Sequence, residues 1–209
     1  MTSLTEDCAI DATSEPRSRA ERNTQALRDA ARDVFARSGF YEARIVDVVT
    51  AAGVGVGTFY RHFGSKTALL AAVLEDVIDD IYNSGARRDD DPEDTAGQIA
   101  ASNRRFLELY RRHAPLLSLL EQLAPQNEQF GAMFLSVRER AVERQVETVE
   151  RLQREGVVSA AVDARRVAGL LVAMTNAQAH IWFTLGEPTD TETDIAALTH
   201  VWTRALGLS

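Results

Sequence analysis

Apolar residues recur at three- and four-residue spacing along almost the whole chain after Pro16, and this period constrains the fold more than any other feature. Such spacing places side chains on one face of a helix. No stretch of convincing length alternates apolar and polar residues as a half-buried strand would, and there is no internal repeat. The sequence therefore predicts an all-α protein. The first predicted helix runs from Asn23 to Gly39, and its apolar face comprises Leu27, Ala30, Ala31, Val34 and Phe35.

Caps, glycines and prolines delimit the predicted helices. Ser65 and Asp163 are good N-caps, and Pro115 suits the first turn of a new helix. Gly39 and Gly156 close the helices that precede them, because glycine adopts a left-handed conformation at little cost. The helices after the first are Ile45–Ala52, Val56–His62, one that starts after Ser65, then 95–112, 115–124, 127–155, 163–185 and 191–206, with loops at Gly85–Asp94 and Gly186–Asp194.

Charge is distributed unevenly along the 209 residues. The formal net charge of −8 by itself argues against nucleic-acid binding. Residues 1–16, however, contain four acidic residues and no Arg or Lys, whereas residues 17–66 contain nine Arg or Lys against five acids, a net of +4. A basic N-terminal module on an acidic body indicates one end that faces a polyanion. A difference this small is equally compatible with chance scatter.

The composition is that of a soluble globular protein, with 45% hydrophobic and 26% charged residues. The one cysteine, Cys8, lies in a polar N-terminal segment, so an internal disulfide is excluded and a reducing compartment is expected. No segment approaches the roughly 18 uninterrupted apolar residues of a membrane span, and the N-terminus lacks a basic-then-apolar signal pattern. We expect a cytoplasmic protein that does not contact membranes.

The glycine-rich segment AAGVGVGTFYRHFGSK, Ala51–Lys66, has two interpretations. It follows the β-branched run RIVDVV, so one candidate is a strand, a phosphate-binding loop and a helix. A dinucleotide fingerprint requires G-x-G-x-x-G, however, and Gly53, Gly55 and Gly57 form G-x-G-x-G, one residue short. No glycine directly precedes a lysine, as a P-loop requires, and no parallel sheet is predicted. The nucleotide interpretation is therefore disfavoured.

A helix-turn-helix explains the same residues one at a time. Gly53 permits the positive φ of a sharp turn, and Val54 fills the core beneath it. Gly55 starts the second helix and leaves its first N–H groups available to a phosphate. Phe59 and Phe63, four residues apart, face inward. The outward face, which suits a helix lying in a major groove, consists of Val56, Gly57, Thr58, Tyr60, Arg61 and His62.

These motifs make the N-terminal part of the chain recognisable. The segments AARDVFARSGF and IVDVVTAAGVGVGTFYRHFGSKTALL, within residues 23–70, resemble the DNA-binding domain of the TetR family of transcriptional regulators. The resemblance implies a tail over residues 1–18, a three-helix DNA-binding domain over 19–64, and a larger helical bundle over 65–209 for ligand binding and dimerisation. It further implies a ligand-released repressor that binds a pseudo-palindromic, double-stranded DNA operator as a homodimer.

The resemblance also assigns DNA contacts. A threonine hydroxyl and methyl can serve base edges, whereas phenol and ammonium groups suit phosphate oxygens. For two of the phosphate contacts a plain structural role is the alternative: Tyr60 would cover a turn, and Lys66 would be a solvated lysine. The implied base contacts are Val56, Gly57 and Thr58, and the implied phosphate contacts are Tyr60, His62 and Lys66.

Two positions depart from the family pattern. Relatives usually carry Ser or Thr where this chain has Arg44, which cannot cap a helix but can reach a phosphate. Relatives often carry a polar or basic residue where this chain has Val56, so base reading leans on Thr58, on thymine methyl contact and on DNA shape. Three arginines before the first helix either add phosphate or minor-groove contacts or belong to a solvated tail: Arg17, Arg19 and Arg22.

The helix predicted over 163–185 is apolar on more than one face, so it must be buried on two sides. One side suits its own core and the other suits a partner subunit. Together with the helix over 191–206 it would form a four-helix interface across a two-fold axis, as the resemblance also implies. The residues assigned to this interface are Val172, Ala179, Phe183, Leu198 and Trp202.

Helices between 95 and 155 carry many aromatic and aliphatic residues, which are either plain core or the wall of a ligand pocket. No cluster of buried cations is evident, so the expected effector is small and mostly hydrophobic. The pocket residues predicted from this reasoning are Phe106, Tyr110, Leu117, Leu120, Phe130, Phe134, Met174 and Gln178.

An enzyme is the rival class. Glu139 and Glu143 on the 127–155 helix resemble the carboxylates of helical-bundle metal sites, but no glutamate is followed by His three residues later. The histidines are isolated, so neither a metal site, a cofactor nor a catalytic residue is predicted. Arginines alternate with these glutamates, which is typical of a solvated, ion-paired face. A non-DNA-binding helical adaptor is the third option, and it leaves the polar face around Thr58 unexplained.

Overall fold

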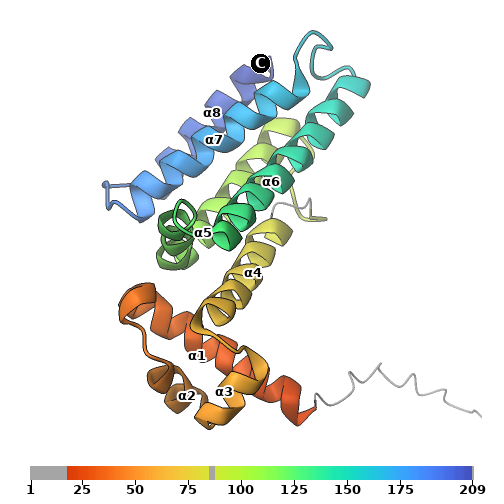
Figure 1. Cartoon of the computed structure of the whole chain (residues 1–209). Coiled ribbons are helices and arrows are strands. Elements are labelled where there is room, and N and C mark those ends of the chain that lie inside the picture. The colour runs from red at the N-terminus through yellow and green to blue at the C-terminus, as the bar shows by residue number, and fades with distance from the viewer. Residues whose placement is uncertain (1–17, 85–87, 209) are drawn as a thin grey trace, which may run out of the picture.

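The computed structural model describes residues 18–84 and 88–208, and within these ranges the chain forms eight helices and no strand, which confirms the all-α prediction. Figure 1 shows a small unit of three helices, α1–α3, and a larger bundle above it, with α4 leading from one to the other. The N-terminal tail with Cys8 and Arg17, and the first residues of the Gly85–Asp94 loop, lie outside the described residues. The helices are α1 Arg19–Glu42, α2 Ile45–Ala52, α3 Val56–His62, α4 Lys66–Ser84, α5 Thr95–Leu123, α6 Glu128–Arg154, α7 Ala164–Phe183 and α8 Thr191–Ala205.

Helix α1 begins before the position predicted from its apolar stripe. Ser18 and Glu21 form a reciprocal capping box: the Ser18 hydroxyl accepts from the Glu21 N–H, and the Glu21 carboxylate accepts from the Ser18 N–H. The assignment of Arg19 and Arg22 to a tail before the first helix is therefore wrong, because both lie in the first turn of α1. Gly39, at φ 71°, interrupts the helical backbone as expected, and one further turn follows it.

The core of the three-helix unit continues into the rest of the molecule. Phe35 and Phe59 are fully buried between α1, α2 and α3, and Leu70 in the early part of α4 is buried with them. The same cluster extends to Leu116 on α5 and Phe130 on α6. The expected domain boundary between residues 64 and 65 immediately precedes α4. Helix α4 lies wholly after this boundary, and it packs both against α1 of the DNA-binding unit and against α5 and α6 of the bundle.

Pro115 lies inside a continuous helix, so the prediction of two helices at 95–112 and 115–124 is wrong. Proline lacks the N–H that would bond to the carbonyl four residues earlier, and it normally kinks or ends a helix. Here the flanking Ala114, Leu116 and Leu119 are all buried, and α5 packs against α1, α4, α6, α7 and α8. This packing on several sides outweighs the local cost of one proline.

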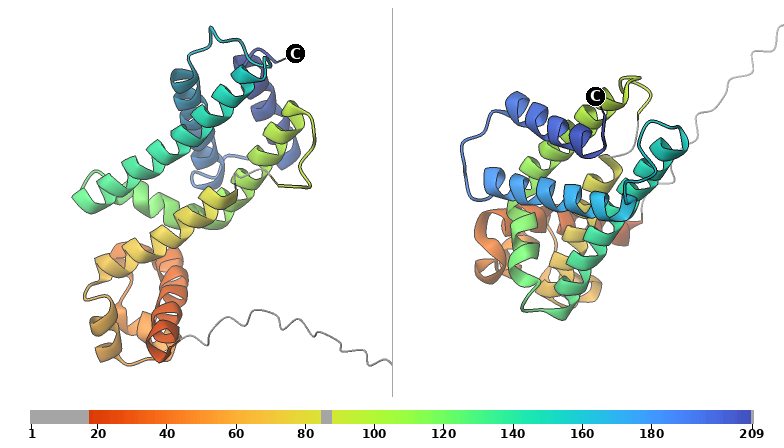
Figure 2. Two further views of the ribbon diagram at one scale, coloured as in Figure 1. Left: turned by 90° about the vertical axis from the view of Figure 1, so that its right-hand side faces the viewer. Right: turned by 90° about the horizontal axis from the view of Figure 1, so that it is seen from above.

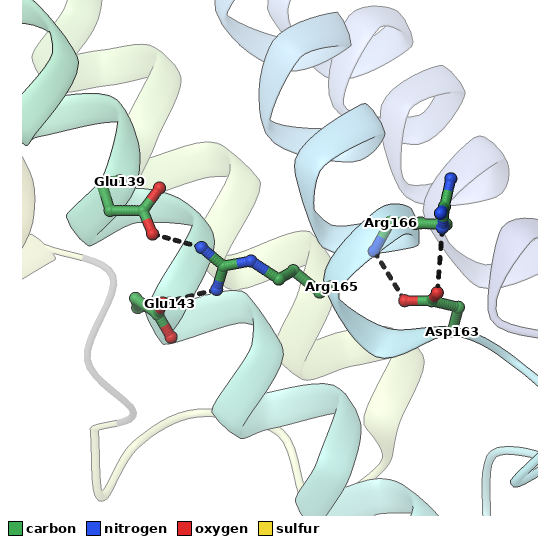
Figure 3. Close-up of polar contacts among 5 residues, drawn as sticks. All are labelled: Glu139, Glu143, Asp163, Arg165 and Arg166. Atoms are coloured by element: carbon green, nitrogen blue, oxygen red, sulfur yellow. Dashed lines mark hydrogen bonds and ion pairs between the residues drawn. The ribbon is translucent and has the colours of Figure 1, made fainter.

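Helices α6, α7 and α8 complete the bundle, with α6 against α7 and α8 against α5 (Figure 2). The predicted Asp163 cap is confirmed, since its carboxylate accepts from the Arg166 N–H at 3.0 Å. Arg165 on α7 bonds to both Glu139 and Glu143 on α6 (Figure 3), and it lowers the pKa of Glu143. These glutamates are thus part of an ion-paired, exposed face, as their alternation with arginine predicts.

His113 on α5 is buried where α1, α4 and α5 meet. Its side chain is 5% exposed, and its Nε2 lies 3.8 Å from an Asp80 carboxylate oxygen on α4. Burial lowers the pKa of His113, and the positive charges of Arg32 and Arg112 lower it further, whereas Asp80 acts in the opposite direction. The folded protein therefore holds this imidazole neutral at a pH at which the unfolded chain would protonate it.

This arrangement predicts that stability falls as the pH drops below about 6.5, the pKa of an unperturbed histidine. Below that value the unfolded state binds a proton that the folded state refuses, which favours unfolding. Denaturant midpoints measured at pH 7.5 and pH 5.5 should differ more for the native chain than for His113→Gln. Replacing the exposed His200 by Gln is the control and should leave the difference unchanged. Equal pH dependence in the native chain and in His113→Gln would contradict this account.

Candidate nucleic-acid interface and ligand cavity

The turn between α2 and α3 is a glycine-capped helix end. Gly53 has φ 66° and ψ 29°, and its N–H donates to the carbonyl of Thr50 at 3.2 Å. The N–H of Val54 donates to the carbonyl of Val49 at 3.0 Å, which completes a Schellman motif. Val54 is half-buried against the core. The predicted positive-φ turn and the boundaries of α2 and α3 are thereby confirmed.

Helix α3 presents one face to the core and another to solvent. Phe59 is fully buried and its ring stacks on Phe63 with centroids 6.3 Å apart. On the outward face, Val56 and Tyr60 are exposed to 46% and 57%. A Cβ added to Gly57 would meet no atom within 4 Å, so this part of the helix backbone is open to a partner. Helix α3 lies at the end of the molecule remote from α7 and α8 (Figure 1).

Thr58 and Arg61 are linked on this outward face. Arg61 lies one turn after Thr58 on α3, and its guanidinium donates to the Thr58 hydroxyl at 3.3 Å. The contact holds the guanidinium beside the threonine, and both side chains present groups that can bond to a base edge.

Arg44 occupies the N-cap of α2 and makes no side-chain capping bond, as expected of arginine. Its guanidinium instead donates two hydrogen bonds to the Asp47 carboxylate, from Nε to Oδ2 at 2.9 Å and from Nη2 to Oδ1 at 2.8 Å. The pair lowers the pKa of Asp47 and raises that of Arg44. Asp47 also places a negative charge in the first turn of α2, where the helix dipole favours it.

His62 and Lys66 make contacts inside the DNA-binding unit. The Nδ1 of His62 lies 3.0 Å from the Thr24 hydroxyl on α1. The Lys66 ammonium donates to the carbonyls of Tyr41 at 3.2 Å and Ala43 at 2.9 Å, so it fastens the end of α1 to the start of α4. The alternative of a merely solvated lysine is therefore wrong. The sequence contained no clear signal for this inward role.

A cavity of about 240 Å³ lies within the bundle, with walls from α4 to α8. Of the predicted pocket residues, Phe106, Tyr110 and Leu117 line it. The other five predicted pocket residues do not line this cavity. Leu120 and Phe130 belong to the core shared with the DNA-binding unit, Phe134 is exposed, Met174 packs in the cluster around Ala179, and Gln178 bonds to Glu187.

Three arginines line this cavity. No cluster of buried cations is evident from the sequence, and the three differ in burial: the Arg105 side chain is 13% exposed, whereas that of Arg151 is 40% exposed. Arg105 comes from α5, and Arg144 and Arg151 come from α6. The sequence did contain a signal: Arg144 and Arg151 are seven residues apart and share the α6 face that carries Ala141 and Thr148. The regular alternation of arginine with glutamate along α6 obscured it.

The residues assigned to a dimer interface point into their own protomer. Ala179 is fully buried, and the buried Trp202 indole donates to the Thr175 hydroxyl at 3.0 Å. The stripe of α7 that carries Val172 and Ala179 therefore packs mainly within its own chain. The residues assigned to the interface, all packed or lining space within one chain, are Val172, Ala179, Phe183, Leu198 and Trp202. The exposed apolar residues of α7, α8 and the turn after α7 are instead Leu170, Ile181, Leu185 and Val201.

Neither a metal-binding cluster nor a membrane-spanning helix is found in the described ranges. Residues 18–84 and 88–208 contain no group of three or more His, Cys, Asp or Glu side chains that could hold a metal ion. None of the helices in those ranges combines the length and the apolar character needed to cross a bilayer.

A helix-turn-helix unit with an exposed polar second helix, carried on a helical bundle with an internal cavity, defines a class of DNA-binding regulator. Residues 27–73 match the family model described as bacterial regulatory proteins, tetR family. The chain is 32% identical over 151 residues to the HTH-type transcriptional repressor SCO4008 of Streptomyces coelicolor, with 71% of this chain and 73% of that protein covered. This protein belongs to the TetR family of transcriptional regulators.

Other similarities divide between the DNA-binding unit and the whole fold. The HTH-type transcriptional regulator SAR0097 of Staphylococcus aureus is 36% identical over 67 residues, 32% of this chain and 35% of that protein. The TetR family transcriptional regulator PfmR of Thermus thermophilus superposes with a TM-score of 0.66 at 19% identity, covering 86% of this chain and 97% of that one. Salmonella enterica GusR gives 0.73 at 21% identity, covering 91% and 98%. The two solved structures share the complete fold.

Proposed function

We propose that this transcriptional regulator is a ligand-released repressor that binds a pseudo-palindromic operator as a homodimer in the cytoplasm. The observation that carries the proposal is the exposed outward face of α3, a helix that follows the Gly53 turn and packs on the core through the buried Phe59. Residues 19–64 would form the DNA-binding domain, residues 65–209 the ligand-binding and dimerisation domain, and residues 1–18 a tail.

In the proposed complex α3 lies in the major groove. Thr58 and Arg61 bond to base edges together, Val56 contacts a thymine methyl group, and Tyr60 donates to a phosphate. Gly57 supports this docking because it leaves the backbone open to close approach.

The remaining assigned residues surround this contact. Arg44 can share its exposed guanidinium between Asp47 and a phosphate. Gly55 lies at the start of α3, where a phosphate can approach the backbone. His62 and Lys66 would reach phosphates only with the donor capacity left by their contacts to Thr24 and to the α1 carbonyls, so we expect them mainly to position the unit.

The proposed dimer interface is the exposed apolar face of α7 and α8. Leu170 and Ile181 lie on one stripe of α7, Leu185 directly follows that helix, and Val201 lies on α8. Burying this face against a two-fold copy would remove apolar area from water. A symmetric dimer would place two α3 helices in successive major grooves, about 34–36 Å apart.

The proposed release mechanism runs through α4. Ile78 and Ile81 on α4 line the cavity, while Leu70 on the same helix is buried in the core of the DNA-binding unit. A ligand that favours one position of α4 would favour one spacing of the two α3 helices in the dimer. If that spacing does not fit the operator, the ligand shifts the population away from the DNA-bound form.

Operator binding by substituted proteins tests the proposed DNA contacts. Tyr60→Phe keeps the ring but loses the hydroxyl, so affinity should fall by a few-fold on every duplex alike. Thr58→Ala should lower affinity and also reduce discrimination between the operator and its single-base variants, each normally worth about 1–3 kcal/mol. Affinity should fall steeply with salt. Binding that is insensitive to salt, or Thr58→Ala that leaves base preference intact, would overturn the proposed contacts.

A further inference from the structure

We infer that the cavity takes a small amphipathic anion, with an apolar body beside α4 and a carboxylate or similar group at Arg144. The chemistry of the cavity wall carries this inference, and only its regulatory consequence rests on the proposed function. The cavity, at about 240 Å³, is smaller than the roughly 300–1,000 Å³ of sites for drug-sized ligands, so the ligand is small.

One half of the cavity is apolar. Ile78 and Ile81 from α4 and Leu117 from α5 face Val137 and Ala141 from the first half of α6. Ile78, Ile81, Leu117 and Val137 also pack on the core shared with the DNA-binding unit. A hydrocarbon or aromatic group in this half would be buried beside the helix that enters that unit.

The other half of the wall, between the start of α5 and the end of α6, contains the charged residues Arg105 and Arg151 and, among the described lining residues, Asp91. Arg144 lies at its border with the apolar half. Neutral hydrogen-bonding groups surround them, including Asn103 on α5, Thr148 on α6 and Thr175 on α7. A ligand whose polar end is negative satisfies this half, whereas a cationic ligand would meet like charge.

The three arginines differ in their place along the cavity. Arg105 bonds to Asp91 through both terminal nitrogens, at 2.5 and 3.1 Å, and both side chains are largely buried. Arg151 lies near the end of α6 and pairs with Glu155 at 3.1 Å, and its side chain is 40% exposed. Arg144 lies between the two halves, one turn after Ala141 and one turn before Thr148. This position makes the Arg144 guanidinium the group best placed to bind an anionic head while the ligand body fills the apolar half.

Matched ligands with different head groups test the inference without DNA. Octanoate and 3-phenylpropionate are compared with 1-octanol and 3-phenylpropan-1-ol, and with octylamine and 3-phenylpropylamine. Binding to the full chain at pH 7.5 is measured by calorimetry and by tryptophan fluorescence, since Trp202 lines the cavity. At least one acid should bind about ten-fold or more tightly than its alcohol and its amine, because hydrogen bonds to charged groups are the stronger ones.

Substitution of Arg144 assigns the preference to this side chain. Arg144→Met should reduce the advantage of the acid over its alcohol to less than about three-fold, and Arg144→Lys should retain part of it. Arg138→Met, an exposed arginine on the same helix, is the control and should retain all of it. Binding of neither acid, equal or tighter binding of the alcohol or amine, or an unchanged preference in Arg144→Met would overturn the inference.

A separate measurement of operator binding distinguishes a failure of the proposed function from a failure of the cavity assignment. A protein that binds acids selectively but no operator would contradict the proposed function and leave the cavity assignment intact. A protein that binds its operator but shows no preference for acids would contradict the cavity assignment alone.

Discussion

Replacing Leu170 by glutamate is expected to convert the proposed dimer into monomers and to lower operator affinity by about 100-fold or more. Leu170 is 71% exposed in the single chain, on the exposed apolar face of α7. A buried carboxylate without a partner would cost several kcal/mol at a two-fold interface, where it occurs twice. Loss of the dimer removes the second α3 helix, and linked binding of two sites typically contributes 10²–10⁴-fold.

Sedimentation or light scattering measures the oligomeric state of Leu170→Glu, and a gel shift measures its operator affinity. Leu135→Glu is the matched control, because Leu135 is also a highly exposed leucine, at 66%, but lies on α6. The control should remain dimeric and bind the operator normally. A dimeric Leu170→Glu, or a Leu135→Glu that dissociates, would show that the dimer uses another face.

Phe59→Ala is expected to destabilise the protein by about 3–5 kcal/mol, the usual cost of deleting a fully buried aromatic ring. Phe59 has no exposed surface, and it supports α3 from beneath through Phe63 and the cluster that includes Leu27 and Leu70. Because that cluster continues into α5 and α6, the loss should lower the denaturant midpoint of the whole chain rather than melt α3 alone.

The neighbouring residue provides the control for this second prediction. Tyr60→Phe removes only an exposed hydroxyl, so its unfolding free energy should stay within about 0.5 kcal/mol of the native value. Substitutions of the two adjacent residues should thus have different effects. Phe59→Ala should lower stability and, through it, DNA binding, whereas Tyr60→Phe should lower DNA binding alone. A Phe59→Ala variant of native stability would contradict the assigned core.

Local backbone chemistry explains why the DNA-binding unit could be predicted closely. Gly53 is needed for a left-handed turn, and the hydrophobic spacing from Val48 to Phe63 leaves one way to bury the two short helices. The Pro115 error has the opposite origin. A proline is a strong local signal, but continuity of α5 was decided by contacts with five other helices that the local sequence does not specify.

The faces of the bundle helices could not be predicted, for a related reason. Helix α7 carries two apolar stripes, and periodicity identifies the stripes without saying which meets the protomer's own core. Trp202 belongs to the apolar stripe of the last helix, which suits an interface equally well, but its indole donates to Thr175 inside the chain. Arg144 alternates with glutamates along its helix, a pattern typical of a solvated face, yet it lines the cavity together with Arg105 and Arg151.

The sequence also did not reveal that some charged side chains make contacts inside the molecule. Lys66 fastens the end of α1 to the start of α4 through the carbonyls of Tyr41 and Ala43. Arg28 on α1 pairs with Asp76 on α4 at 2.6 Å. Both contacts couple the DNA-binding unit to α4, the helix that also borders the cavity. They depend on how α1 and α4 meet, and that geometry cannot be read from the spacing of residues along either helix.

Selection of bound sequences from random double-stranded DNA, followed by footprinting of the winning duplex, tests the central claim most directly. The account predicts a pseudo-palindrome whose half-sites lie one helical turn, or a multiple of about 10–10.5 base pairs, apart, and which is protected symmetrically by two chains. Thr58→Ala should broaden the selected sequence within each half-site. Failure to enrich any sequence, or enrichment of a single unpaired half-site occupied by one chain, would contradict the account of a dimeric, sequence-specific repressor.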